Sequence, residues 1–372
     1  MQMLTVLIKP SSSMCNMQCK YCFYKDETKF RETASYGMMT DETAKILVKK
    51  AFEAAQKAVS FMFQGGEPTL AGLPFYAKFV EWVKKYNTKQ IDVYLSIQTN
   101  GYVIDEAWAQ FLHDHHFLVG LSMDGPSDIH DFMRIDNAGQ PTHERVMRAA
   151  GLFDRYQVEY NVLCVVNNFV AKHADRVYRW FRDHNFRYLQ FIPCLDGFDG
   201  SKENFSLDIK NFEQFLKVTF RNYFEDYRNG NYVSIRTFDN YIAMLMGRPP
   251  ESCGMSGFCT CYFVVEADGS VFPCDFYVLD QWKMGNIRTD SFEEMFKSDV
   301  VRSFVESSRY IDEHCRKCKW YGLCRGGCRR NREPFVEGRP SLNVFCAAYR
   351  GFFKECYSRM KQMAWELSGR RQ

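Results

Sequence analysis

The sequence of 372 residues contains no apolar run that approaches the roughly 18 residues needed to cross a bilayer, which argues against an integral membrane protein. Its first residues lack the basic, apolar and small-residue order of a secretory signal, so a cytoplasmic protein is expected. Neither sign of charge dominates, because 48 basic residues face 45 acidic residues and leave a formal charge of +3. This balance does not indicate a surface for nucleic acid or for an anionic membrane.

The composition is not extreme in its apolar or charged content. Apolar residues make up 46% and charged residues 25%, which is ordinary for a globular protein with a sizeable core. At 372 residues the chain exceeds the length at which one core usually stops growing, so we expect two domains. The chain has fifteen cysteines, and cytoplasmic thiols are kept reduced. Metal ligation therefore explains the cysteines better than a disulfide framework does.

Six short apolar segments alternate with longer segments of helical period up to residue 193, which indicates βα units and a parallel sheet. Thr40 is expected to cap the first long helix, with Asp41 and Glu42 near its positive end. Because a closed barrel needs eight strands, six favour an open, partial (β/α)6 barrel of the TIM type. The expected strands span residues 4–9, 59–63, 91–98, 117–122, 159–166 and 187–192.

The pattern of the sequence changes near Leu195. Residues 211–245 have a helical pattern, and cysteines become dense after Pro249 and Pro250. We therefore expect an α/β barrel domain over residues 1–235 and a cysteine-rich domain over residues 236–372.

A CxxxCxxC loop directly follows the first expected strand, with Cys15, Cys19 and Cys22. Barrel enzymes place their active sites at this edge, where the strands end. Three thiolates can hold three irons of a [4Fe–4S] cube and leave the fourth iron open for substrate chemistry. A structural zinc site has four protein ligands and no open position, but the next cysteine in the sequence after Cys22 is Cys164. An iron–sulfur cluster is therefore favoured over zinc.

A second group of cysteines follows residue 250, and the stretch from Cys315 to Cys328 reads CxxCxxxxxCxxxC. On this stretch alone a zinc ribbon and an iron–sulfur site are comparable interpretations, because CxxC pairs occur in both. Basic residues crowd the same stretch. We interpret them as compensation for thiolate-bound clusters and as a docking patch for an acidic electron donor, and not as a nucleic-acid surface.

Polar residues stand where three further strands are expected to end. Gln64, Gly65, Gly66 and Glu67 follow the second strand, and the third and fourth strands end in QTNG and SMDGP. Such residues are typical of a barrel active site, but each could equally cap a helix or form a turn. Asp275 is a further candidate, because a carboxylate beside Cys274 could accept a proton while an electron leaves through a metal. From its surroundings alone, a turn or cap role is favoured.

The CxxxCxxC loop, with an aromatic residue before its last cysteine, and the GGEP turn one βα unit later resemble the radical S-adenosylmethionine superfamily. The resemblance implies that the open iron is chelated by the amino and carboxylate groups of S-adenosylmethionine, and that the GGE motif binds the amino group. Arg134 would pair with the carboxylate, because a guanidinium fork suits that geometry. The implied cofactor contacts are Tyr21, Gly65, Gly66, Glu67, Ser122, Arg134 and Leu195.

The order of the later cysteines resembles the SPASM domain, an extension of this superfamily with two auxiliary [4Fe–4S] clusters. Three [4Fe–4S] clusters are thus implied. By this resemblance the ligands are Cys253, Cys259, Cys274 and Cys328 for the first auxiliary cluster, and Cys315, Cys318, Cys324 and Cys346 for the second. The other four are interpreted as small buried hydrophobic residues, namely Cys164, Cys194, Cys261 and Cys356.

Over essentially the whole chain, motifs such as CNMQCKYCFY, FQGGEPTLAG, CGMSGFCTC and PCDFYV resemble the anaerobic sulfatase-maturating enzymes. The resemblance implies oxidation of a cysteine or serine in a sulfatase CxPxR or SxPxR motif to Cα-formylglycine, with Asp275 as general base. It also implies a sulfatase polypeptide as substrate and a low-potential electron donor of ferredoxin or flavodoxin type, and we expect a monomer. Tyr24 and Gln64 are candidates for contact with the peptide, although core or turn roles are equally open.

Two other functions stay open from the sequence. A SPASM maturase that crosslinks a ribosomally made peptide would begin with the same radical, but no peptide-recognition extension is evident before the first strand. A zinc-bound scaffold is the non-enzymatic alternative. The sequence does not decide between cysteine and serine as the residue oxidised.

Overall fold

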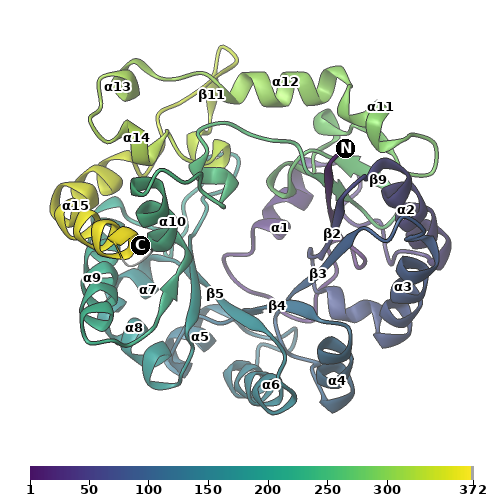
Figure 1. Cartoon of the computed structure of the whole chain (residues 1–372), viewed down its shortest axis with the longest axis horizontal. Coiled ribbons are helices and arrows are strands. Elements are labelled where there is room, and N and C mark those ends of the chain that lie inside the picture. The colour runs from purple at the N-terminus through teal and green to yellow at the C-terminus, as the bar shows by residue number, and fades with distance from the viewer. Residues whose placement is uncertain (370–372) are drawn as a thin grey trace. The chain divides into compact units, whose positions relative to one another are not determined.

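The computed structural model describes residues 1–369 (Figure 1). The chain forms two compact units. Unit 1 consists of residues 1–122, 131–160 and 261–304, and unit 2 consists of residues 123–130, 161–260 and the chain from 305 onward. Each unit is assembled from separate stretches of sequence. A single domain boundary near residue 235 therefore stays a prediction.

Four parallel strands form the centre of unit 1, in the order β1-β2-β3-β4. In β2, Phe61 and Phe63 point to the same side because side chains alternate along a strand, and both rings pack on Phe79, at centroid distances of 5.2 and 4.9 Å. The four strands lie within one residue of the expected bounds at each end. They are β1 (Met3–Ile8), β2 (Ala58–Phe63), β3 (Asp92–Thr99) and β4 (Phe117–Ser122).

Helices cover the outer side of these strands (Figure 1). Thr40 caps the first long helix as expected, since its Oγ1 accepts the amide of Thr43 over 3.2 Å. Two shorter segments, α1 (Phe23–Glu27) and the 3-10 helix η1 (Thr28–Phe30), precede it. The outer helices and the connecting 3-10 helix are α2 (Asp41–Ala54), η2 (Pro68–Ala71), α3 (Leu73–Tyr86), α4 (Glu106–Asp114) and α6 (His143–Tyr156).

A late stretch of the chain joins the open side of β1. Strand β8 (Phe263–Val265) runs parallel to β1, and β9 (Ser270–Phe272) returns antiparallel to β8 through a turn at Asp268 and Gly269. This arrangement brings Asp275, at the start of the 3-10 helix η4 (Asp275–Tyr277), to the carboxyl edge of β1. The remaining elements of this stretch are η5 (Asp280–Trp282), β10 (Gly285–Asn286) and α11 (Phe292–Phe296).

Unit 2 contains β6 (Tyr188–Pro193) and all of β5 (Tyr160–Val166) except its first residue, again within one residue of expectation, and Leu195 follows β6. A seventh parallel strand, β7 (Ser234–Ile235), was not expected and divides the predicted helical stretch 211–245. Aromatic rings pack between two long helices. The ring centroids of Phe220 in one helix and Phe352 in the other are 5.8 Å apart. The helices are α7 (Asn168–Lys172), α8 (Ala174–Asp183), α9 (Ile209–Arg228), α10 (Arg236–Leu245) and α15 (Cys346–Gly369).

Short elements fill the cysteine-rich part of unit 2. No disulfide joins any of the fifteen cysteines within residues 1–369. Within the same residues, no helix has the length and apolar character to pass through a membrane. The short elements are η3 (Cys253–Met255), α13 (Glu313–Arg316), α14 (Tyr321–Cys324), η6 (Arg329–Arg332), β11 (Phe335–Val336) and β12 (Arg339–Pro340), while α5 (Ser127–Met133) and α12 (Asp299–Ser308) contain residues of both units.

Candidate functional site

The cysteine loop, residues 15–22, follows the carboxyl end of β1 and is anchored by main-chain hydrogen bonds. The amides of Gln18 and Lys20 donate to carbonyls of the segment 133–135 over 2.8 and 3.0 Å. On the same segment, Arg134 is 5% exposed and places its Nη1 4.0 Å from the Sγ of Cys19. A buried guanidinium therefore stands beside the loop, at the carboxyl edge of the parallel strands.

The thiol of Cys15 receives two hydrogen bonds. Its Sγ accepts the amide of Met17 over 3.4 Å and the Nδ2 of Asn100 over 3.7 Å. Burial, and after it the carboxylate of Glu67, raise the pKa of the Cys15 thiol to about 12. A thiolate in this position needs positive charge beside it, which iron in a thiolate-bound cluster provides. The loop therefore fits an iron–sulfur cluster.

Glu67 is 1% exposed, and both oxygens of its carboxylate accept hydrogen bonds from other groups of the protein. Oε1 accepts from Thr69 Oγ1 over 2.6 Å and from Thr99 Oγ1 over 2.7 Å, while Oε2 accepts the Asn100 amide over 2.8 Å. The side chain thus ties the GGEP turn to the end of β3. The Glu67 carboxylate is therefore occupied by donors of its own chain.

The two glycines of the same turn are enclosed by protein. A Cβ at Gly65 would lie 2.6 Å from Cε of Lys9, and a Cβ at Gly66 would lie 2.2 Å from the carbonyl oxygen of Met14. Both glycines also have positive φ, at +101° and +56°. The family resemblance accounts for these glycines as part of a motif that binds the cofactor. The structure adds a second reason, which is the close approach of a buried lysine and of the main chain next to Cys15.

We predict that Gly66→Ala displaces the cysteine loop. The new methyl group would collide with the Met14 carbonyl, which also accepts the amide of Glu67 over 2.8 Å. The iron content after anaerobic reconstitution should fall by about four atoms per chain, the content of one cube. Gly37→Ala is the matched control, since Gly37 has φ +74° with no heavy atom within 4 Å of a Cβ. Equal iron content in both variants would contradict the prediction.

Two further expected cofactor contacts also lie in unit 1. The guanidinium carbon of Arg134 lies 5.3 Å from the centre of the Tyr21 ring, so both side chains border the cysteine loop. Ser122 ends β4, and its Oγ accepts the Nε2 of Gln98 over 3.0 Å. Leu195 belongs to unit 2.

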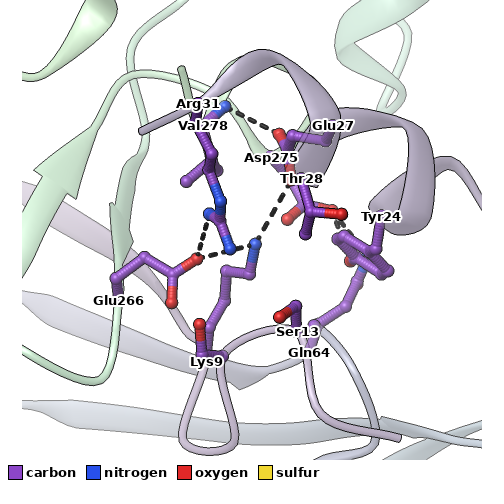
Figure 2. Close-up of polar contacts among 12 residues, drawn as sticks. Lys9, Ser13, Tyr24, Glu27, Thr28, Arg31, Gln64, Glu266, Asp275 and Val278 are labelled. Carbon is purple, nitrogen blue, oxygen red and sulfur yellow. Dashed lines mark hydrogen bonds and ion pairs between the residues drawn. The ribbon is translucent and has the colours of Figure 1, made fainter. Parts of the chain in front are cut away.

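Asp275 is 4% exposed and belongs to a three-residue hydrogen-bond network (Figure 2). Its Oδ2 accepts from the Tyr24 hydroxyl over 2.7 Å and from Gln64 Nε2 over 2.9 Å, and Gln64 Nε2 is also 2.9 Å from the Tyr24 hydroxyl. Its Oδ1 is buried and has no hydrogen-bond partner within residues 1–369. Burial raises the pKa of this carboxyl above its ordinary value. One oxygen of Asp275 is thus fixed, and the other is available as an acceptor.

A buried group of charges lies beside this network (Figure 2). Lys9 Nζ is 3.0 Å from Glu266 Oε1 and 3.4 Å from Glu27 Oε2, and Arg31 Nη1 is 2.8 Å from the same Glu266 oxygen. Burial alone would lower the pKa of Lys9, but Glu266, Glu27 and Asp275 raise it above its ordinary value. Burial raises the pKa of Glu27 to about 7, although Lys9 opposes the rise. Two cations and two carboxyl groups therefore offset one another next to Asp275.

Unit 2 contains the four cysteines expected to hold the second auxiliary cluster. The pKa of Cys324 is raised to about 11, first by burial and then by the thiols of Cys346, Cys315 and Cys318. Burial raises the pKa of Cys315 too, and Cys346 adds to the rise. This electrostatic influence among thiols from two segments of chain is consistent with a shared four-iron cube.

Three of the four cysteines assigned to the first auxiliary cluster also belong to unit 2. Burial, and after it the thiols of Cys253 and Cys259, raise the pKa of Cys328 to about 12. The fourth, Cys274, belongs to unit 1, where its Sγ is 3.7 Å from the hydroxyl of Tyr262.

Sequence reasoning missed the charged group formed by Lys9, Glu27, Arg31 and Glu266. One signal was present, since Lys9 ends the first expected strand directly before the cysteine loop, and a lysine there is a candidate site residue. The partners of Lys9 gave no such signal, because Arg31 and Glu266 are 235 positions apart in the sequence.

Comparisons with known proteins agree with this site. A profile of the radical SAM superfamily matches residues 10–193, and a profile of the SPASM iron-sulfur cluster-binding domain matches residues 257–319. A cysteine-type anaerobic sulfatase-maturating enzyme of Clostridium novyi is 46% identical over 372 residues, the full length of both chains. A serine-type anaerobic sulfatase-maturating enzyme of Bacteroides thetaiotaomicron is 30% identical over 98% of this chain and 92% of its own.

A solved structure supports the same relationship. Native anSMEcpe with bound AdoMet and Cp18Cys peptide is 47% identical, with a TM-score of 0.94 over 98% of this chain and 99% of its own. This likeness confirms the expected α/β partial barrel with a cysteine-rich iron–sulfur region. The chain belongs to the anaerobic sulfatase-maturating enzymes, which are radical S-adenosylmethionine enzymes with iron–sulfur clusters.

Proposed function

We propose that this chain oxidises a cysteine in a CxPxR motif of a sulfatase to Cα-formylglycine, with Asp275 as the general base. Relatives that are 46% and 48% identical are of the cysteine type, whereas the serine-type relatives are 28% to 30% identical. The observation that carries the proposal is Asp275 Oδ1, a buried carboxylate oxygen without a hydrogen-bond partner in the described chain. A buried acceptor with this property is suited to receive a substrate proton.

When bound, S-adenosylmethionine and the iron–sulfur clusters supply the radical that removes a β-hydrogen from the substrate cysteine, and they accept the second electron. Asp275 takes the thiol proton on Oδ1. Tyr24 and Gln64 hold Oδ2, which fixes the orientation of the carboxylate. Loss of one hydrogen atom, one proton and one electron converts the thiol to a thioaldehyde, and water then releases sulfide and leaves the aldehyde.

We assign the metal ligands and cofactor contacts as the family resemblance implies. The donors to Cys15 and the grouping of the unit 2 thiols support this assignment. We further propose that the chain works as a cytoplasmic monomer with a ferredoxin- or flavodoxin-type donor, and that residues 1–235 and 236–372 are its domains. The proposed ligand sets are Cys15, Cys19 and Cys22; Cys253, Cys259, Cys274 and Cys328; and Cys315, Cys318, Cys324 and Cys346.

Anaerobic turnover of two peptides tests the function. The peptides should differ only in carrying CxPxR or SxPxR, and mass spectrometry should measure the aldehyde that each forms. We expect the aldehyde from the cysteine peptide at the higher rate. A crosslinked product, or no product with enzyme that still cleaves S-adenosylmethionine, would contradict the proposal.

The metal content tests the cofactor assignment separately. Three four-iron cubes require about twelve iron and twelve sulfide per chain. Zinc in place of iron would contradict all three clusters, and about eight iron would contradict one.

A further inference from the structure

Two short helices, each next to a proposed cluster ligand, contact one another within unit 1. Helix α1 begins directly after Cys22, and η4 begins directly after Cys274. The rings of Phe23 in α1 and Phe276 in η4 pack with centroids 4.8 Å apart. Tyr24 follows Phe23 in α1, and Asp275 precedes Phe276 in η4. The hydrogen bond from Tyr24 to Asp275 therefore joins the residues next to this ring pair. The radical-forming loop and the proposed base are therefore joined through α1.

Glu27 makes the last contact of this series. Its Oε1 accepts the main-chain amide of Val278, the residue after η4, over 2.8 Å. Its Oε2 lies 3.4 Å from Lys9 Nζ (Figure 2). The side chain is 1% exposed, so a main-chain donor on one side and an ammonium group on the other fix both oxygens in place.

Helix α1 depends on such contacts for its position. It has five residues, and a helix of that length is not stable by itself. A buried carboxyl group has a desolvation penalty that an apolar side chain would avoid. A carboxylate at this position therefore needs an explanation beyond packing, and the Val278 hydrogen bond provides one. Because a misplacement of about 1 Å can lower a reaction rate about 100-fold, the spacing between α1 and η4 matters for catalysis.

We infer that Glu27 is a positioning residue that holds the Asp275 turn against the helix after the cysteine loop, so that cofactor cleavage stays coupled to peptide oxidation. This inference rests on the proposed function. Glu27 acts through the main chain of Val278 and the placement of α1, and it takes no part in the proton transfer.

Two substitutions of Glu27 distinguish the effect of its hydrogen bond with Val278 from the effect of its charge. In Glu27→Gln the amide oxygen can still accept the Val278 amide, and Lys9 keeps Glu266 at 3.0 Å. In Glu27→Met the side chain has similar length but no acceptor. We expect Glu27→Met to raise the ratio of 5′-deoxyadenosine to formylglycine at least about tenfold, and Glu27→Gln to stay within about threefold of wild type. A role in stability alone would lower both products together and leave the ratio unchanged.

Hydrogen–deuterium exchange provides a readout without turnover. The Val278 amide should exchange about tenfold faster in Glu27→Met than in wild type, and Glu27→Gln should protect it. Asp226→Asn is the control for loss of a buried carboxylate, because Asp226 is 3% exposed and accepts the Tyr178 hydroxyl over 2.6 Å within unit 2. This control should destabilise the protein without changing the product ratio.

The outcomes distinguish this inference from the proposed function. If wild type makes no formylglycine from the cysteine peptide, the proposed function fails. If wild type does, the inference is overturned by a wild-type ratio in Glu27→Met, by equal ratios in Glu27→Met and Glu27→Gln, or by the same rise in ratio in Asp226→Asn.

Discussion

Asp275→Asn should cleave S-adenosylmethionine at close to the wild-type rate and form formylglycine about 10²- to 10⁴-fold more slowly, the usual effect of losing a general base. The amide keeps an oxygen that can accept from Tyr24 and Gln64, so the network should retain its shape. What it loses is the basic Oδ1, the buried oxygen without a partner in residues 1–369. Chromatography of 5′-deoxyadenosine and mass spectrometry of the peptide, from the same reaction, measure both rates.

Asp268→Asn is the matched control for this prediction. Asp268 lies in the turn between β8 and β9, and its oxygens accept the amide and hydroxyl of Ser270 over 2.9 and 2.7 Å. It is thus a carboxylate of the same hairpin with a turn role, which is the role that local sequence favoured for Asp275. Undiminished formylglycine yield in Asp275→Asn would return Asp275 to that role. Equal losses in the two variants would indicate damage to the hairpin.

The sequence predicted the strands of the barrel well, because each is a short segment rich in apolar and β-branched residues between longer segments of helical period. It did not predict β7, since Ser234–Ile235 is too short to show a period. Strand β8 was missed as a partner of β1 for another reason. Its three residues pair with Val6, Leu7 and Ile8 from more than 250 positions away, and no local pattern reports such a pairing.

The cysteine sets could be proposed from spacing because a cluster constrains the positions of its ligands along the chain. The environment of Asp275 could not. Tyr24 and Asp275 are 251 positions apart, and their hydrogen bond exists only because β8 and β9 bring η4 to the end of β1. From the sequence, the roles of Tyr24 and Gln64 therefore stayed open, with peptide contact and packing as the alternatives. The structure instead shows them holding the proposed base.

Glu67 shows a different limit of sequence reasoning. The GGE motif was correctly taken to mark the edge of the sheet where the loop lies, but the motif alone does not say which of its atoms face a ligand. In the structure the carboxylate is enclosed by Thr69, Thr99 and Asn100. A motif identifies a position, whereas the role of each atom depends on neighbours that come from other strands.

Lys9→Met should lower the free energy of unfolding by about 3–5 kcal/mol, the usual effect of removing one partner from a buried ion pair. Lys9 is fully buried between Glu266 and Glu27, and its stem runs past Gly65, where no Cβ would fit. Methionine matches the length of that stem, so packing should change little. The free energy of unfolding should fall because the carboxyl groups of Glu27 and Glu266 would stay buried with Arg31 as the remaining cation in this group. Denaturant unfolding of the anaerobically reconstituted protein measures the effect.

A second substitution tests whether charge is the cause. Lys9→Met combined with Glu27→Gln should be more stable than Lys9→Met alone, because Glu27 loses its ion-pair partner in Lys9→Met, whereas Glu266 keeps Arg31. Lys78→Met removes a lysine from an exposed ion pair with Asp41, where both side chains are about half exposed, and should change stability by about 1 kcal/mol or less. Equal unfolding of Lys9→Met and Lys78→Met would show that the buried charges do not stabilise unit 1. If the double variant were less stable than Lys9→Met, lost packing around Lys9 would be the better explanation.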